Sequence, residues 1–169
     1  SHHAEECRKL NIPFIYDPGQ QIARLDGDTL LRDSKGASML IMNEYEAGMF
    51  RKQTGMADSE LFTLAEVVIV TLAEKGAEIR TREGVLSVPP AKELRTLDPT
   101  GVGDGFRAGL MTGMDLGFDW DTCGKKGSLA ATYVLETDGP QNHSYTIDEF
   151  IRRYTENFGK NEKLEKLRS

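Results

Sequence analysis

Two kinds of hydrophobic pattern follow one another along this chain. Short uninterrupted apolar runs occupy residues 12–16, 38–43 and 67–72, and the last of these, VVIVTL, is uncharged and rich in β-branched side chains. These runs predict strands. Apolar strands with no polar alternation are typical of a parallel sheet that is covered on both faces.

Between these runs, apolar residues recur every three or four positions, which predicts helices. The predicted helices cover residues 2–10, 27–37, 44–55, 58–66, 106–116, 122–135 and 146–158. Asp58 or Ser59 is the expected cap of the fourth helix. His2 and His3 are interpreted as opening the first helix, with a tag remnant or a metal site as the alternatives.

The order of these elements sets the expected fold. Residues 77–83 and 84–90 alternate around Gly84 and predict an antiparallel hairpin. Strands that alternate with helices indicate an α/β layered fold, with a mostly parallel sheet flanked by helices. Sites in such sheets lie at the carboxyl ends of the strands. One domain is expected over residues 1–159, followed by a charged, frayed tail at 160–169.

Composition narrows the functional classes. A net charge of −6 over 169 residues disfavours a non-specific nucleic-acid binder, although a local basic pocket for one small anion remains possible. The chain has two cysteines, Cys7 and Cys123, in no paired motif, which favours a reducing, cytosolic setting. No apolar run approaches the roughly 20 residues that span a bilayer, and no secretory leader is evident, so membrane association and secretion are not expected.

The segment DPTGVGDGF, residues 98–106, combines three glycines with two aspartates directly before a predicted helix. Glycines let backbone N–H groups at a helix start approach an anion, so Gly101, Val102, Gly103 and Asp104 are candidates for a phosphate nest. An acid beside phosphate is explained if Asp104 accepts the proton of an attacking hydroxyl. A plain turn, with Asp104 as a helix cap, is the alternative.

Two other phosphate motifs do not fit this segment. No lysine follows the glycines, so the segment is not a P-loop. Phe106 stands where the dinucleotide fingerprint has its last glycine, which disfavours an NAD-dependent oxidoreductase.

DPTGVGDGF closely resembles the second signature of the ribokinase-like (PfkB) carbohydrate and nucleoside kinases, D-[TP]-T-G-A-G-D-x-F. The resemblance implies ATP-dependent phosphoryl transfer, with Asp104 as catalytic base and Gly101, Val102 and Gly103 as the anion hole. It also implies a ribokinase-like sheet. Arg107, directly after the motif, either approaches phosphate or acceptor or lies across the helix surface.

Two further segments resemble motifs of the same family. NEYE, residues 43–46, resembles its N-x-x-E motif, which implies that Asn43 and Glu46 organise Mg²⁺ and phosphate through water. VVIVTLAEKGAEI resembles the strand V-T-x-G-x-x-G, which implies that Thr71 and Gly76 border the nucleotide. Ala73 departs from this pattern because it stands where glycine is usual.

The resemblance also implies two further sites. Asp98 and Thr100 would lie near a monovalent-cation site, such as one for K⁺, with Gly139 completing it. The helix at 122–135 and the segment PPAKEL at 89–94 would flank adenine.

Residues 16–21, 98–110 and 132–143 look most like bacterial and archaeal nucleoside kinases of the adenosine kinase type. A PfkB-type sugar kinase and a non-catalytic nucleotide-binding module are the alternatives. The family's N-terminal glycine pair and β lid have no counterpart here, so the chain is interpreted as the C-terminal part of such a kinase. We expect it to be poorly active alone, and to form a homodimer or associate with the missing part.

Overall fold

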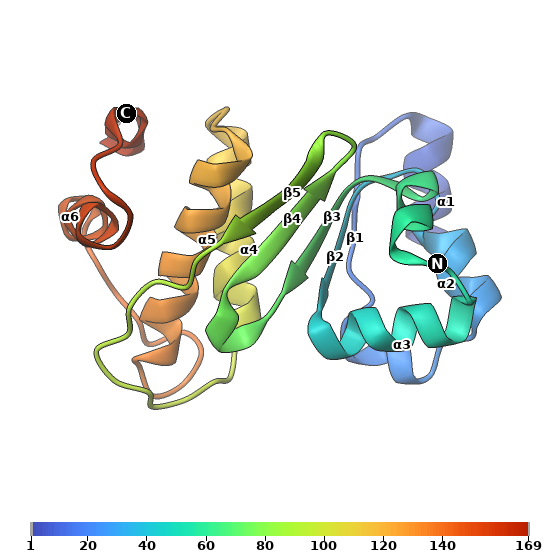
Figure 1. Ribbon diagram of the computed structural model, residues 1–169, viewed down its shortest axis with the longest axis horizontal. Helices are drawn as coiled ribbons and strands as arrows, with labels where there is room; N and C mark the ends of the chain where they lie inside the picture. The colour runs from blue at the N-terminus through green and yellow to red at the C-terminus, as the bar shows by residue number, and fades with distance from the viewer. Residues whose placement is uncertain (1, 169) are drawn as a thin grey trace. The chain divides into compact units, whose positions relative to one another are not determined.

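The computed structural model describes residues 2–168, which form an α/β fold (Figure 1). The helices are α1 (His2–Leu10), α2 (Gly27–Ser34), α3 (Glu44–Thr54), α4 (Val102–Asp115), α5 (Trp120–Leu135) and α6 (Ile147–Phe158). Short 3₁₀ segments are η1 (Gly19–Ala23), η2 (Asp58–Thr63), η3 (Ala73–Lys75) and η4 (Glu162–Arg168). The strands are β1 (Ile15–Tyr16), β2 (Ala37–Asn43), β3 (Ala65–Thr71), β4 (Ala77–Thr81) and β5 (Gly84–Val88).

The five strands form one sheet in the order β1-β2-β3-β4-β5. β1, β2 and β3 pair in parallel, and the register places Asn43 beside Thr71 at the carboxyl ends of β2 and β3. β4 and β5 are the two antiparallel arms of a hairpin, as Figure 1 shows. The predicted mostly parallel sheet and its hairpin are therefore confirmed.

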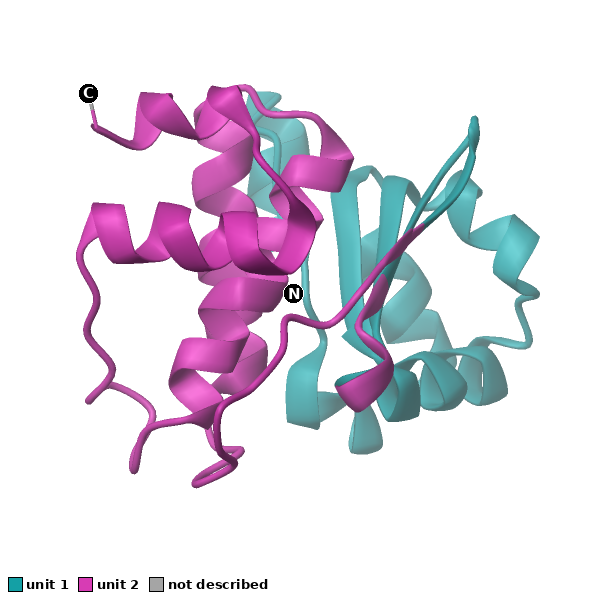
Figure 2. Ribbon diagram, turned by 60° about the vertical axis from the view of Figure 1, so that its left-hand side comes forward, with its two compact units in different colours: residues 1–73, 78–86 teal, residues 74–77, 87–169 magenta. Residues whose placement is uncertain are grey.

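The chain divides into two compact units (Figure 2). Unit 1 comprises residues 1–73 and 78–86, and unit 2 comprises residues 74–77 and 87–169. Unit 1 holds the parallel strands, α1, α2 and α3. Unit 2 holds α4, α5, α6 and η4, so the two groups of predicted site residues lie in different units.

The core of unit 1 forms where α3 packs on β2 and β3, η2 packs on β3, and α2 and η1 pack on α3. Its buried members are Ile22, Leu30, Ala37, Leu40, Met42, Ala47, Phe50, Leu61, Leu64, Ala65, Val68 and Val70. Met39 and Ile41, on the alternate side of β2, are also buried. Burial of successive residues explains why this strand has an uninterrupted apolar sequence.

The structure corrects several predicted boundaries. α4 begins at Val102, four residues before the predicted start at Phe106, so Gly103 and Gly105 lie in its first turn. Of the helix predicted at 58–66, only Asp58–Thr63 are helical, as the 3₁₀ segment η2, and Ala65 and Glu66 belong to β3. The cap residue of η2 is Ala57 instead of Asp58 or Ser59. The Ala57 N–H donates to the Glu60 carboxylate at 2.6 Å, which anchors this short turn.

The frayed tail predicted at 160–169 is instead packed onto unit 2 through residue 168. Leu164 of η4 is fully buried. The Lys163 ammonium donates to the carboxylate of Asp119, which is also the N-cap of α5. The many charges of this segment predict exposure, but the buried leucine and two ion pairs, Lys163 with Asp119 and Arg168 with Asp148, hold it in place.

The ion pair between Lys163 and Asp119 predicts that the pKa of Asp119 is lowered. The Lys163 ammonium, together with the N–H of Thr122, lowers the pKa of Asp119 to about 2. The stability that this carboxylate contributes is present above its ordinary pKa of 3.8 and is lost as the pH falls toward 2. We expect Lys163→Met to raise the Asp119 pKa toward 3.8 in an NMR titration of the carboxyl carbons.

Lys160→Met is the control for this titration, because the exposed Lys160 pairs with Glu162 instead. An Asp119 pKa that is the same in Lys163→Met and in the unmodified chain would mean that the tail is frayed in solution.

Candidate active site

The N-terminus of α4 differs from those of α2, α3, α5 and α6. Each of those four helices begins with a side chain that accepts the N–H of the third helical residue. The pairs are Asp26 with Thr29 (2.7 Å), Asn43 with Glu46 (2.8 Å), Asp119 with Thr122 (2.9 Å) and Thr146 with Glu149 (3.2 Å). The N-cap of α4 is Gly101, which has no side chain to do this.

The uncapped start of α4 leaves backbone donors available. Val102 N–H donates to the Pro99 carbonyl at 3.3 Å and Gly105 N–H to the Gly101 carbonyl at 2.8 Å. Within residues 2–168, no group accepts the N–H of Gly103 or Asp104. Two adjacent donors at the positive end of a helix form a site for an anion.

The three glycines of this segment differ in what an added side chain would meet. Gly101 has φ +82°, and a Cβ there would come within 2.6 Å of Pro140. A Cβ on Gly105 would lie 2.7 Å from Val134 of α5, so Gly105 permits close helix packing. A Cβ on Gly103 would meet only the tip of the Arg107 side chain, at 2.7 Å. Packing therefore explains Gly101 and Gly105, but it does not explain Gly103.

Asp104 and Arg107 place opposite charges on the first turns of α4. Asp104 is exposed, so its carboxylate does not point into the core. The Arg107 guanidinium lies alongside Gly103, because a Cβ on that glycine would be 2.7 Å from one of the guanidinium nitrogens. This position is compatible with both alternatives for Arg107, so its approach to a bound anion stays a prediction.

Asp98 fastens the turn that precedes α4. One of its carboxylate oxygens accepts the Thr100 N–H at 2.8 Å, and the other accepts the Gly139 N–H at 3.2 Å. The bond from Thr100, and then that from Gly139, lowers the pKa of Asp98. The structure thus brings together the three residues predicted for a monovalent cation. The hydrogen bonds among Asp98, Thr100 and Gly139 also join the 98–101 turn to the turn after α5.

In unit 1, the predicted magnesium residues form the capping box of α3. Asn43 accepts the Glu46 N–H and Glu46 accepts the Asn43 N–H, both at 2.8 Å. Glu46 is buried, whereas Asn43 is exposed. The bond from Asn43 uses one carboxylate oxygen of Glu46, and no residue among 2–168 donates to the other. One carboxylate that acts through water fits Mg²⁺, which keeps several waters.

Thr71 lies next to Asn43 in the sheet register, so these two predicted residues meet at one sheet edge. Ala73, which follows Thr71, has φ +51°. This left-handed conformation is the one that the family's glycine at this position would adopt without strain. Gly76, in unit 2, has φ +90°, and a Cβ there would lie 2.0 Å from the Val88 carbonyl oxygen. Packing alone therefore requires Gly76, and its contact with nucleotide stays a prediction.

Residues 3–147 match the model of the pfkB family carbohydrate kinases. The chain belongs to this family. The family assignment made from DPTGVGDGF is therefore confirmed.

Relatives within the pfkB family include a nucleoside kinase of Methanocaldococcus jannaschii. It is 32% identical over 141 residues, which cover 82% of this chain and 46% of that protein. A Burkholderia thailandensis nucleoside kinase solved with inosine is 38% identical with a TM-score of 0.91, over 94% of this chain and 52% of the other. The same enzyme solved with ADP-inosine is 39% identical with a TM-score of 0.90, over 93% of this chain and 49% of the other. This chain thus spans about half the length of these relatives.

The two segments predicted to flank adenine in a pfkB kinase are neighbours in unit 2. The Ala91 N–H donates to the Ser128 hydroxyl of α5 at 2.8 Å, and the Leu94 N–H donates to Glu136 at 2.6 Å. Their contact with adenine stays a prediction. None of the helices within 2–168 has the length and apolarity needed to cross a bilayer. The same residues contain no group of three or more His, Cys, Asp or Glu side chains arranged for a metal.

Pro140 and Gly105 are site-shaping residues that the sequence did not reveal. Pro140 follows the predicted Gly139 and packs on Gly101, and Gly105 sets the depth at which α4 packs on α5. The packing role of Gly105 could have been inferred from the sequence, because Gly105, Gly109 and Gly113 recur every four positions along one helix.

The different roles of the glycines predict opposite effects of one substitution. We expect Gly103→Ala to stabilise the chain by up to about 1 kcal/mol, because alanine favours a helix over glycine and meets only a movable side chain. We expect Gly105→Ala to destabilise it by about 1–3 kcal/mol through overpacking against Val134. Urea unfolding of both variants measures the two free energies. Equal losses of stability would show that Gly103 is also a packing glycine.

Proposed function

We propose that this chain forms the catalytic-base and nucleotide-binding part of an ATP-dependent kinase that phosphorylates a hydroxyl of a nucleoside. The observation that carries the proposal is the exposed Asp104 carboxylate next to two unoccupied backbone donors at the start of α4. Donors alone would serve a phosphate-binding module. An acid beside them would repel a phosphate that is merely bound, and it gains a use when a proton must be removed.

The proposed reaction is an in-line displacement at the γ-phosphorus of ATP. Asp104 accepts the proton of the acceptor hydroxyl while the hydroxyl oxygen forms a bond to phosphorus. The bond from phosphorus to the bridging oxygen of ADP breaks, and ADP leaves. The N–H groups of Gly103 and Asp104, with Arg107 nearby, stabilise the charge on the transferred phosphoryl oxygens.

Cations are part of this proposal. Glu46 and Asn43 would hold Mg²⁺ through water, and this ion neutralises phosphate charge when it is bound. Asp98, with Thr100 and Gly139, would hold K⁺ beside the turn. The residues fit such ions because the Asp98 carboxylate is kept ionised by its two N–H bonds.

A nucleoside is favoured over a simple sugar as the acceptor. The relatives described above are named nucleoside kinases, and two of the solved structures contain inosine. A pfkB sugar kinase is the second candidate. Because the chain spans about half the length of these relatives, we propose that it phosphorylates poorly alone and acts together with the remainder of a kinase.

The test is ADP release with Mg-ATP and inosine, adenosine, ribose or fructose, for the longest protein that contains this sequence. We expect turnover with the nucleosides, and we expect Asp104→Asn to lower kcat by roughly 10²–10⁴-fold because a positioned base contributes about that much. KM for ATP should change little, because Asn keeps the shape of the side chain.

Asp115→Asn is the matched control, since Asp115 is an exposed carboxylate at the other end of α4. A loss of activity equal to that of Asp104→Asn would point to a general charge effect. Full activity of Asp104→Asn would leave a non-catalytic nucleotide-binding role, and turnover with ribose alone would identify a sugar kinase.

A further inference from the structure

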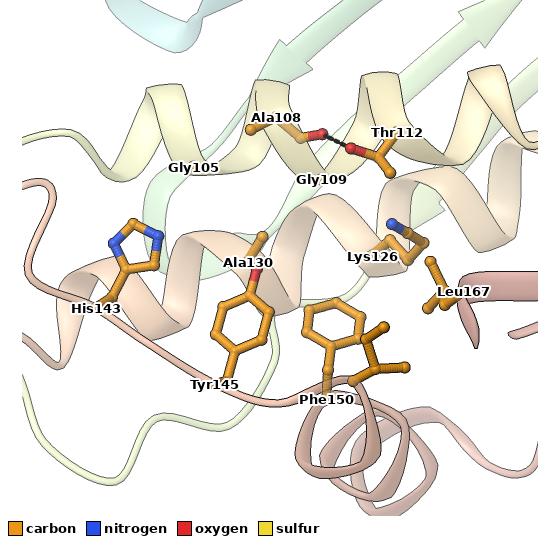
Figure 3. A pocket seen from close by; sticks show the side chains of 11 residues that line it. Gly105, Ala108, Gly109, Thr112, Lys126, Ala130, His143, Tyr145, Phe150 and Leu167 are labelled. Carbon is orange, nitrogen blue, oxygen red and sulfur yellow. Dashed lines mark hydrogen bonds between the residues drawn. The ribbon is translucent and has the colours of Figure 1, made fainter. Parts of the chain in front are cut away.

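Unit 2 contains a cavity alongside α4, whose wall begins at Gly105 in the first turn of the helix. Its volume is about 210 Å³, it is half open to solvent, and α4, α5, the segment before α6, α6 and η4 line it (Figure 3). A cavity of about 150 Å³ can bind benzene, so this volume is enough for one small organic molecule. Gly105, Ala108 and Gly109 form its wall on α4.

Lys126 of α5 reaches this cavity with a buried charge. The residue is only 4% exposed. No carboxylate within residues 2–168 forms an ion pair with it, and its nearest described partner is the Phe150 ring, 5.6 Å from the ammonium. A buried ammonium without an anion is costly. Burial accordingly lowers the pKa of Lys126.

A line of rings connects Lys126 with a second unsatisfied polar group. The Phe150 and Tyr145 rings lie 5.2 Å apart, and Tyr145 and His143 lie 6.2 Å apart in a stacked arrangement. The Nδ1 atom of His143 is buried and makes no hydrogen bond with residues 2–168. Figure 3 shows Lys126 at one end of the cavity, His143 at the other and the two rings between them.

We propose that this cavity binds a small aromatic carboxylate with a second polar group at its far end. The carboxylate would pair with the Lys126 ammonium, the ring would stack on Phe150 and Tyr145, and the polar group would hydrogen-bond to His143. Small residues on α4 leave room for a flat ring. The ligand would thus give the Lys126 ammonium an anion and the His143 ring a hydrogen bond, which the described side chains of unit 2 do not provide.

The probe pair for this proposal is 4-hydroxybenzoate and its neutral analogue 4-hydroxybenzamide. In calorimetric or NMR titration of the 169-residue chain, we expect the carboxylate to bind at least about tenfold more tightly, as expected for a hydrogen bond to a charged group. Lys126→Met should abolish this preference, and Lys125→Met should keep it, because Lys125 pairs with Asp121 outside the cavity.

Ala108→Leu is a second variant that does not depend on the lysine. Ala108 lines the cavity but is exposed on α4, so a larger side chain fills the space without entering the core. We expect it to abolish binding while the unfolding transition is retained. The proposal is overturned if no saturable binding occurs, if the amide binds as well as the carboxylate, or if neither Lys126→Met nor Ala108→Leu weakens binding.

Discussion

The close packing of α4 on α5 is the constraint on which the position of the DPTGVGDGF segment in unit 2 depends. A Cβ on Gly109 would lie 2.7 Å from the Lys126 carbonyl oxygen, and one on Gly127 would lie 2.8 Å from the Phe106 carbonyl oxygen. The two helices therefore touch backbone to backbone at points on both of them. Because such contacts leave no side chain to rearrange, the axis of α4 is fixed and so is the direction in which its first N–H groups point.

The turn before α4 is held by a different interaction. Asp98 joins Thr100 to Gly139 through two backbone N–H bonds, and Pro140 packs on Gly101. The end of α5 is thus tied to the beginning of α4. The two aspartates of the motif therefore differ. The Asp98 carboxylate is engaged in these backbone bonds, whereas the Asp104 carboxylate is exposed.

Local sequence identified the family better than it placed the helix boundaries. DPTGVGDGF was sufficient for the family assignment because its glycines and acids lie within a few residues of one another. The start of α4 was predicted too late, since glycine has a low helix propensity and packing on α5 overrides it. Likewise, the tail was expected to fray because its one buried residue, Leu164, lies among charges. Other features of the structure could not be predicted from local sequence because they bring together residues that are distant along the chain. Lys126 and His143 line one cavity only because α6 and the segment before it fold back onto α5.

The acid at the third helical position makes different contacts in α4 than in α3 and α6. Glu46 in α3 and Glu149 in α6 occupy that position and accept the N–H of their own cap residues, at 2.8 and 2.7 Å. Asp104 occupies the same position in α4, but its side chain is one methylene shorter and its cap residue is glycine. Neither half of a capping box forms there. Since the other four helix starts use side chains to satisfy this donor, the exception at α4 is a property of the site and not of helix starts in this chain.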